Sequence, residues 1–228
     1  MKKILFALFA HPDDESFGPS GTLLLEARAG TEIHLILLTS GDSGMNPDAH
    51  NDLSAVRLEE WHKAGKLMQA HELHYLGYKD GQLNNHSMIT ATMQVIELIT
   101  PIINSAPVDT QIEFMTNDLN GITGHIDHIV AARITCQVFY QMKSRDSRFQ
   151  RIRLCCLSTK EAPVDNINWL YMEAGRPDDQ IDEIVDARHL HDELIPIIRS
   201  HHTQRHDGER HIAHRGDDLG LDYFIVKT

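Results

Sequence analysis

Short apolar runs alternate with segments of helical periodicity along this 228-residue chain, and no other feature limits its fold as strongly. Short, continuously apolar runs are typical of buried strands, whereas apolar residues three or four positions apart indicate helices. The sequence predicts strands at 3–10, 32–39, 73–78, 111–116, 152–158 and 223–226, and helices at 21–29, 54–70, 88–104, 128–143 and 190–200. This order predicts an α/β fold in which a mostly parallel sheet is flanked by helices on both faces.

Length and composition describe one globular unit. A chain of this length with 41% hydrophobic and 24% charged residues can bury a proper core, so a single domain over residues 1–228 is expected. The irregular stretch 159–188 is expected to decorate that domain. Its aromatic residues Trp169 and Tyr171 are candidates either for stacking on a ligand or for core packing.

The net charge and the cysteines limit the classes of binding partner and the cellular compartment that we expect for this protein. Thirty-three acidic residues against 21 basic ones give a net charge of −12, which disfavours nucleic acid and anionic membranes as partners. No apolar stretch reaches the roughly 18 residues that a membrane span requires. The three cysteines, of which Cys155 and Cys156 are adjacent, indicate reduced thiols and therefore a cytoplasmic protein.

The first ten residues, MKKILFALFA, resemble a secretory signal peptide, with a basic tip, an apolar run and small residues near the end. The apolar run 4–10 lies at the short limit for such a signal. Cleavage would also remove the segment that positions His11. We therefore interpret these residues as the first core strand.

Four polar loops follow predicted strands, and each is rich in functional side chains. They are HPDDE at 11–15, SGDSG at 40–44, KDGQLNN at 79–85 and NDLNGITGHIDH at 117–128. In a parallel sheet the ligand site lies outside the carboxyl ends of the strands, so these loops are expected to meet at one edge. The SGDSG loop is interpreted as turn chemistry beside the site, with a phosphate cradle as the alternative.

Two of these loops together offer three imidazoles and four carboxylates, in HPDDE and in GHIDH at 124–128. Two histidines and a carboxylate, with a water in the fourth position, are a normal ligand set for catalytic zinc. A divalent cation would also explain why three carboxylates follow one another, since it neutralises charges that otherwise repel. Spacing alone does not distinguish Asp13 from Asp14 as the ligand.

Each of these residues also has a simpler interpretation. Asp13, Asp14 and Glu15 are alternatively caps of the following helix, and His125 and His128 are alternatively exposed loop residues. Arg57 has a charge pair with Glu59 or Glu60 as its alternative. The late histidines are expected to lie in a solvated loop rather than in a second metal site; they are His201, His202, His206, His211 and His214.

The motifs resemble those of the PIG-L/LmbE-like zinc-dependent N-acetylglucosaminyl deacetylases. The resemblance rests on AHPDDE at 10–15 and GHIDH at 124–128, with support from RLEE at 57–60, DGQL at 80–83 and HHTQ at 201–204, and it runs through most of the chain. It implies a Rossmann-like three-layer α/β sandwich. No glycine-rich dinucleotide fingerprint follows the first strand, so the fold does not imply NAD. Two differences bear on substrate preference: Ile126 replaces a common proline, and NGITG contains no tyrosine.

The resemblance also assigns roles to residues. It implies that His11, Asp14 and His128 are metal ligands for zinc, although the same ligands suit ferrous iron. Asp13 becomes the general base, His125 the electrostatic or acid partner of the reaction, and Asp127 the residue that orients His125. Arg57 and His201 are expected on the substrate side. A homo-oligomer, either a trimer or a hexamer, is implied as well.

The resulting hypothesis is a zinc-dependent hydrolase that removes an N-acetyl group from a small N-acetylglucosamine-type conjugate. In it a metal-activated water attacks the amide, Asp13 accepts the proton, and the leaving amine is protonated by Asp13 or His125. One alternative is a metal-dependent hydrolase of another amide or an ester. Another is a ligand-binding member of the fold without turnover.

Overall fold

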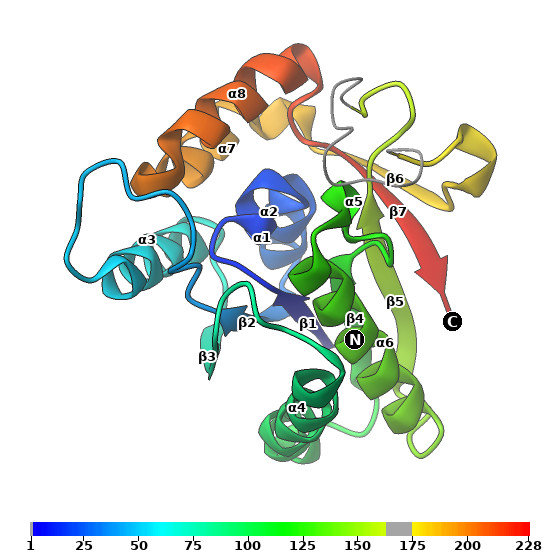
Figure 1. Ribbon diagram of the computed structural model, residues 1–228. Coiled ribbons are helices and arrows are strands. Elements are labelled where there is room, and N and C mark those ends of the chain that lie inside the picture. Colours follow the sequence, from blue (N-terminus) through cyan, green and yellow to red (C-terminus); the bar gives the residue numbers. More distant parts are fainter. Residues whose placement is uncertain (1, 163–174) are drawn as a thin grey trace.

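The computed structural model describes residues 2–162 and 175–228, and Trp169 and Tyr171 therefore lie outside the described residues. The described strands form one seven-stranded sheet in the order β3-β2-β1-β4-β5-β7-β6 (Figure 1). Their bounds are β1 Lys3–Phe9, β2 Glu32–Thr39, β3 Glu72–Tyr78, β4 Gln111–Asn117, β5 Phe149–Cys156, β6 Glu183–Asp186 and β7 Leu221–Lys227.

The sheet is mostly parallel, as the alternation of strands and helices predicts. Strands β1 to β5 pair in parallel, β7 runs antiparallel to β5, and β6 runs antiparallel to β7. The four-residue strand β6 falls in the stretch that the sequence suggested was irregular. It lies at the sheet edge with alternating burial, and four residues carry too little apolar pattern to be recognised.

Helices cover both faces of the sheet, which confirms the three-layer sandwich (Figure 1). Their bounds are α1 Asp14–Phe17, α2 Ser20–Arg28, α3 Leu53–Leu67, α4 Asn85–Ser105, α5 Gly121–Gly124, α6 Ile126–Lys143, α7 His191–Arg199 and α8 Arg205–Arg215. Short 3₁₀ turns occur at Asp178–Gln180, Arg188–Leu190, His202–Gln204 and Gly216–Asp218. None of the helices in the described part of the chain has the length and apolar character that a membrane crossing requires.

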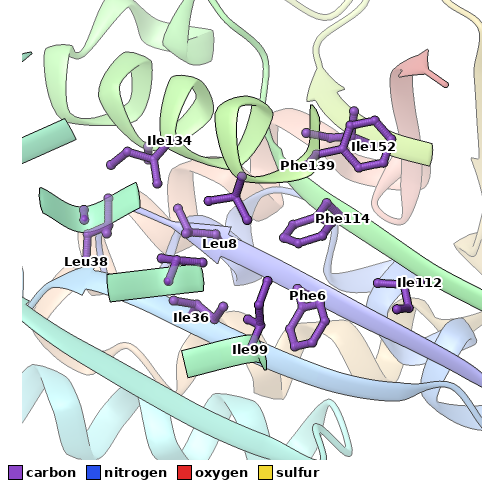
Figure 2. Packing of buried hydrophobic residues seen from close by; sticks show 14 of the residues in the cluster. Phe6, Leu8, Ile36, Leu38, Ile99, Ile112, Phe114, Ile134, Phe139 and Ile152 are labelled. Carbon is purple, nitrogen blue, oxygen red and sulfur yellow. The ribbon is translucent and has the colours of Figure 1, made fainter. Parts of the chain in front are cut away.

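Each face of the sheet has its own core. Helices α4 and α6 pack their apolar sides on one face, where residues such as Phe6, Leu8 and Phe114 are fully buried (Figure 2). Helices α2, α3 and α7 pack on the other face around Leu5, Leu23 and Trp61. This packing fixes the central strands β1 and β4 side by side, and with them the loops that follow these strands.

Helix α8 corrects the expectation of a solvated C-terminal loop. Residues 205–215 are helical, and His206, His211 and His214 all lie on this helix. The helix is held by local packing: the ring of His211 stacks on Phe17 with centroids 5.7 Å apart, and Gly208 lies close to Ile198 and Phe17. Two other histidines of the segment differ, because His202 lies in a 3₁₀ turn and His201 is buried.

Candidate active site

The carboxyl ends of β1 and β4 bring the two motif loops together. These strands are parallel neighbours in the sheet, so the loop after β1, which carries His11 and Asp14, meets the loop after β4. His128 lies in the first turn of α6, directly after that second loop. Segments more than 100 residues apart in the chain therefore share one edge of the sheet, as the loop positions predict.

Donor atoms of three residues face one another: His11, Asp14 and His128. His11 Nδ1 lies 3.0 Å from His128 Nε2, and Asp14 Oδ1 lies 3.1 Å from the same nitrogen. The other oxygen of Asp14 lies 3.9 Å from His11 Nδ1. Donors bound tetrahedrally at about 2.0–2.2 Å from one zinc ion are separated by roughly 3.3–3.5 Å, so the three groups fit such an ion after small adjustments.

The outer nitrogen of each imidazole faces an oxygen, which directs the inner nitrogen to the site. His128 Nδ1 lies 3.0 Å from the carbonyl oxygen of Gly121. His11 Nε2 lies 2.9 Å from Asp80 Oδ1 and 3.5 Å from Asp127 Oδ2, within reach of both charges. With a proton on each outer nitrogen, two lone pairs face each other at 3.0 Å, and a cation between them would remove their repulsion.

The electrostatics of this set favour positive charge. The Asp14 carboxylate accepts hydrogen bonds from the backbone N–H groups of Ala10 and His11. Although burial raises the pKa of Asp14, His128 and His11 hold it well below its usual range. Burial lowers the pKa of His11, but the carboxylates of Asp127, Asp80 and Asp14 together raise it well above the ordinary value. The pocket therefore attracts a cation.

Asp13 directly precedes Asp14 and lies beside these three groups. Its backbone has φ 121° and ψ −25°, a region that residues with a Cβ seldom occupy and that costs on the order of 1–3 kcal/mol. Burial raises the pKa of its carboxyl to about 6, against the opposing charge of Arg57. A carboxylate with that pKa accepts a proton near neutral pH more readily than an ordinary aspartate does.

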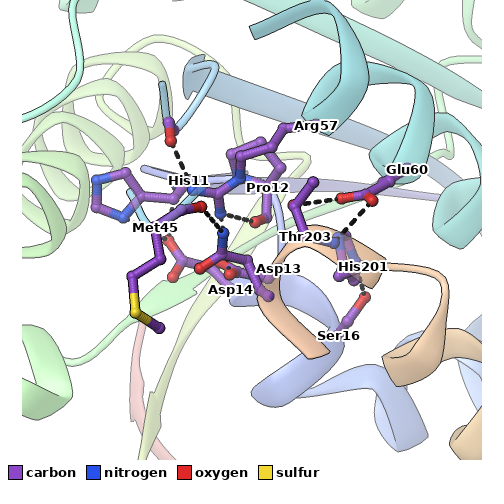
Figure 3. Close-up of polar contacts among 12 residues, drawn as sticks. His11, Pro12, Asp13, Asp14, Ser16, Met45, Arg57, Glu60, His201 and Thr203 are labelled. Atoms are coloured by element: carbon purple, nitrogen blue, oxygen red, sulfur yellow. Dashed lines mark hydrogen bonds and ion pairs between the residues drawn. The ribbon is translucent and has the colours of Figure 1, made fainter. Parts of the chain in front are cut away.

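Arg57 holds the loop that presents Asp13 (Figure 3). Its guanidinium is buried and donates hydrogen bonds to the carbonyl oxygens of Pro12 and Gly41, both at 2.6 Å, and to Asp13 Oδ2 at 3.0 Å. A Cβ at Gly41 would meet the guanidinium, and one at Gly44 would come within 2.6 Å of Arg57 Nη1. The two glycines of SGDSG thus make room for Arg57, which supports the interpretation of this loop as turn chemistry.

His201 is buried and lies against Ser16, to the side of the loop that carries Asp13 (Figure 3). Its Nε2 lies 2.9 Å from Ser16 Oγ and 3.2 Å from Glu15 Oε1. Burial lowers the pKa of His201, but the carboxylates of Glu15 and Asp13 together raise it by more. Glu15 itself is fully buried, and its other oxygen accepts from the Asp13 N–H at 3.3 Å. His201 and Glu15 therefore support α1 from behind.

His125 and Asp127 lie at the start of α6. His125 Nδ1 accepts a hydrogen bond from the Asp127 N–H, and the His125 ring centroid lies 4.8 Å from that of His11. The Asp127 carboxylate accepts from the N–H groups of Gly81 and Leu83. Burial lowers the pKa of His125, and the rings of His11 and His128 lower it further than Asp127 raises it. Asp127 therefore does not raise the pKa of His125 above its ordinary value.

Asp80 is a site residue that the sequence reasoning did not assign. It belongs to the DGQL motif, and its loop follows β3, so it reaches the same sheet edge as the other three loops. One oxygen lies against His11, and the other accepts a hydrogen bond from the Ser43 N–H at 2.8 Å. Its position after a strand was the signal that could have identified it.

A cleft of about 750 Å³ opens beside the ligand set. Asp14, His125 and His128 form one wall, and the polar face of α8, with Arg210, His211 and His214, contributes another. A volume of this size is typical of sites for small molecules. The helix that replaces the expected loop therefore shapes the space in front of the donor atoms.

Comparison with known proteins gives one family match. The family model described as PIG-L, GlcNAc-PI de-N-acetylase, matches residues 6–139, which is more than half of the chain. This range includes both motif loops. A relative in Acidothermus cellulolyticus, named 1D-myo-inositol 2-acetamido-2-deoxy-alpha-D-glucopyranoside deacetylase, is 26% identical over 271 residues, covering 99% of this chain and 89% of the relative.

Solved structures with this fold catalyse more than one reaction. An N,N'-diacetylchitobiose deacetylase from Pyrococcus horikoshii aligns over 99% of this chain and 83% of its own, with 17% identity and a TM-score of 0.64. The 4-carboxy-2-hydroxymuconate hydratase from Pseudomonas putida KT2440 aligns over 100% and 97%, with 14% identity and a TM-score of 0.66. The fold alone therefore does not determine the reaction.

Proposed function

Because the chain belongs to the PIG-L family of GlcNAc-PI de-N-acetylases, we propose that it hydrolyses the N-acetyl group of a small N-acetylglucosamine-type conjugate with the help of a divalent ion. Zinc is the first candidate for that ion, and ferrous iron suits the same ligands. The proposal also includes a single domain over residues 1–228, a homo-oligomer and a cytoplasmic location.

One observation carries the proposal: donor atoms of three residues face each other while a fourth group, Asp13, remains outside them. His11, Asp14 and His128 would hold the ion. Their imidazole nitrogens lie 3.0 Å apart, and one oxygen of Asp14 lies 3.1 Å from His128 Nε2 while the other lies 3.9 Å from His11 Nδ1. A protein that only binds a metal needs no further carboxylate with a raised pKa in a strained backbone position. Hydrolysis does need one, because water must lose a proton as it attacks.

Each residue then has a chemical task. The bound ion would polarise the amide carbonyl and lower the pKa of a bound water. Asp13 accepts the proton of the attacking water, and Arg57 keeps the Asp13 carboxylate in place through the hydrogen bond at 3.0 Å. His125 faces the cleft and stabilises the developing oxyanion. The leaving amine takes its proton from Asp13 or His125.

Other residues act by positioning these groups. Asp80 and Asp127 lie against the outer nitrogen of His11 and orient its inner nitrogen. Arg57 and His201 are both buried and bonded to protein groups, so we assign them to the support of Asp13 and α1. The wall formed by α8 is the part of the cleft left for the remainder of the conjugate.

The test is a substrate panel with and without metal. Metal-free protein, prepared by dialysis against a chelator, is assayed for release of free amine from N-acetylglucosaminyl inositol and N,N'-diacetylchitobiose. We expect no turnover without metal, and turnover restored by about one equivalent of zinc or, under anaerobic conditions, ferrous iron. His62→Gln, on the exposed side of α3, is a matched control that should retain wild-type turnover.

Ester and amino-acid substrates separate the alternatives. Zinc-dependent cleavage of N-acetyl amino acids or p-nitrophenyl acetate, with all sugar substrates inert, would replace the proposal with a different hydrolase. Metal binding without turnover of any substrate would favour the non-catalytic alternative.

A further inference from the structure

A second cluster of histidine and glutamate side chains lies at the amino ends of β2 and β3, at the sheet edge opposite the active site. Both strands begin with Glu-x-His, at Glu32 and His34 in β2 and at Glu72 and His74 in β3. The strands are parallel neighbours in which His34 pairs with Glu72. Because side chains two residues apart point to the same face of a strand, all four side chains lie on one face of the sheet.

Three donor atoms of this cluster are spaced like metal ligands. His34 Nδ1 lies 3.1 Å from His74 Nε2, and Glu72 Oε2 lies 3.7 Å from each of these nitrogens. These separations are close to the roughly 3.3–3.5 Å between ligands of one tetrahedral zinc ion. Two histidines and one carboxylate leave a fourth position for water.

The surroundings orient the buried imidazole. The outer nitrogen of His34, Nε2, lies 3.1 Å from Glu32 Oε1, which fixes the proton on that nitrogen and leaves the lone pair of Nδ1 facing His74. A carboxylate behind a ligating histidine is a common feature of metal sites. The His34 ring also packs against Phe6, with centroids 5.2 Å apart. The side chain of Glu72 is 56% exposed, so an ion has a route from solvent.

We propose that His34, His74 and Glu72 form a second site for a divalent transition-metal ion, with zinc as the probe. The ion would join the edge strand β3 to its neighbour β2 by bonds to side chains of both. Since the ligands come together only when the two strands pair, the ion binds the folded chain and stabilises it by mass action. The competing interpretation is that His74 Nε2 donates a hydrogen bond to His34 Nδ1 and that the cluster does not bind metal.

The test counts zinc ions in the metal-free full-length protein by competition with a chromogenic chelator. We expect wild type to bind two zinc ions per chain, and His74→Gln and Asp14→Ala to bind one each. The double variant should bind none. His189→Gln, an exposed histidine away from both clusters, should still bind two.

Melting temperature gives a second readout, independent of activity. In the Asp14→Ala background, one equivalent of zinc should raise the melting temperature, and addition of Glu72→Gln should weaken zinc binding by at least tenfold and remove most of that rise. Because the side chain of Glu72 is 56% exposed, Glu72→Gln should fold as wild type does.

Two outcomes would overturn the proposal of a second site. One is a wild-type chain that binds a single ion, lost in Asp14→Ala. The other is a second ion that persists in both His74→Gln and Glu72→Gln. A wild-type chain that binds one ion, retained in Asp14→Ala but lost in His74→Gln, would support the second site and refute the catalytic one.

Discussion

The two ends of the same sheet carry the same kind of donor set in different settings. Two imidazole nitrogens face each other at 3.0 Å after β1 and β4, and at 3.1 Å at the start of β2 and β3, each with a carboxylate nearby. At the carboxyl end, Asp13 adds a further carboxylate on a strained backbone, and a cleft of about 750 Å³ adjoins. At the amino end, the donors lie at regular strand positions. For this reason we propose hydrolysis at the carboxyl end, where a further carboxylate and space for a substrate accompany the donor set, and metal binding alone at the amino end.

The largest expected effect is at the carboxyl end, where Asp14→Ala removes a ligand. We expect turnover to fall to background and one zinc ion per chain to be lost, because the two histidines alone hold zinc weakly. Zinc content by elemental analysis and amine release measure both. Retention of turnover would show that Asp14 is not a ligand. The carboxyl end would then lack the carboxylate that makes its donor set comparable with that of the amino end.

Asp13→Asn separates the base from the ligands. We expect kcat to fall by about 10²–10⁴-fold while the zinc content stays that of wild type, since a general base contributes about this much. Steady-state kinetics combined with metal analysis give the result. Loss of zinc in this variant would show that Asp13, rather than Asp14, is a ligand.

Glu26→Ala tests whether the amino half of the sheet mainly serves stability. Near the start of β1, the carboxylate of Glu26 pairs with Arg153 at 2.7 Å and with Lys3 at 2.8 Å, and Arg153 is almost fully buried. Without Glu26, Arg153 keeps only the longer pairs with Glu113 at 3.4 Å and Glu183 at 3.9 Å, so we expect a loss of about 2 kcal/mol in the free energy of unfolding. Urea denaturation measures this loss, and kcat at 25 °C should not change.

The same ion pair should give a pH dependence of stability. Burial raises the pKa of Glu26, but Arg153 and Lys3 lower it by more, to about 2. The folded-state pKa is therefore below that of the unfolded chain, so the stabilisation is complete above about pH 4.5 and is lost as the pH falls toward 2. The difference between wild type and Glu26→Ala should narrow over that range. A constant difference from pH 7 to pH 2 would contradict the assignment.

The smallest expected effect is that of Arg57→Lys. A lysine cannot reach Pro12, Gly41 and Asp13 at once as the guanidinium does, so Asp13 should be less well positioned. We expect kcat to fall about tenfold with little change in KM. A rise in KM with unchanged kcat would instead place Arg57 in contact with substrate, as the family resemblance implies.

The order of strands and helices and the meeting of the two motif loops could be predicted from the sequence. Apolar runs mark buried strands, and parallel strands bring their carboxyl ends to one edge, which is sufficient to place His11 near His128. Helix α8 was not predicted because its sequence, RHDGERHIAHR, has only Ile212 and Ala213 as apolar residues. These two neighbours do not form the pattern of apolar residues three or four positions apart that indicates a helix. Its helical state depends on packing against Phe17 and α7, which no local pattern reveals.

The direction in which a side chain points was the other feature that could not be predicted from the sequence. Nothing local distinguishes an arginine that binds substrate from one that turns inward, and Arg57 turns toward Pro12 and Gly41 because two glycines leave space there. The repeated Glu-x-His in β2 and β3 was visible in the sequence. Its meaning depended on strand register, which a single sequence does not specify.

The proposed metal ligands of the candidate active site come from segments separated by more than 110 residues, one after β1 and one after β4. During synthesis, a growing chain has no such site until the second of these strands has emerged and paired with the first. Zinc uptake at His11, Asp14 and His128 would therefore mark completion of the central strand pair. A time course of uptake during refolding would report when this long-range pairing forms.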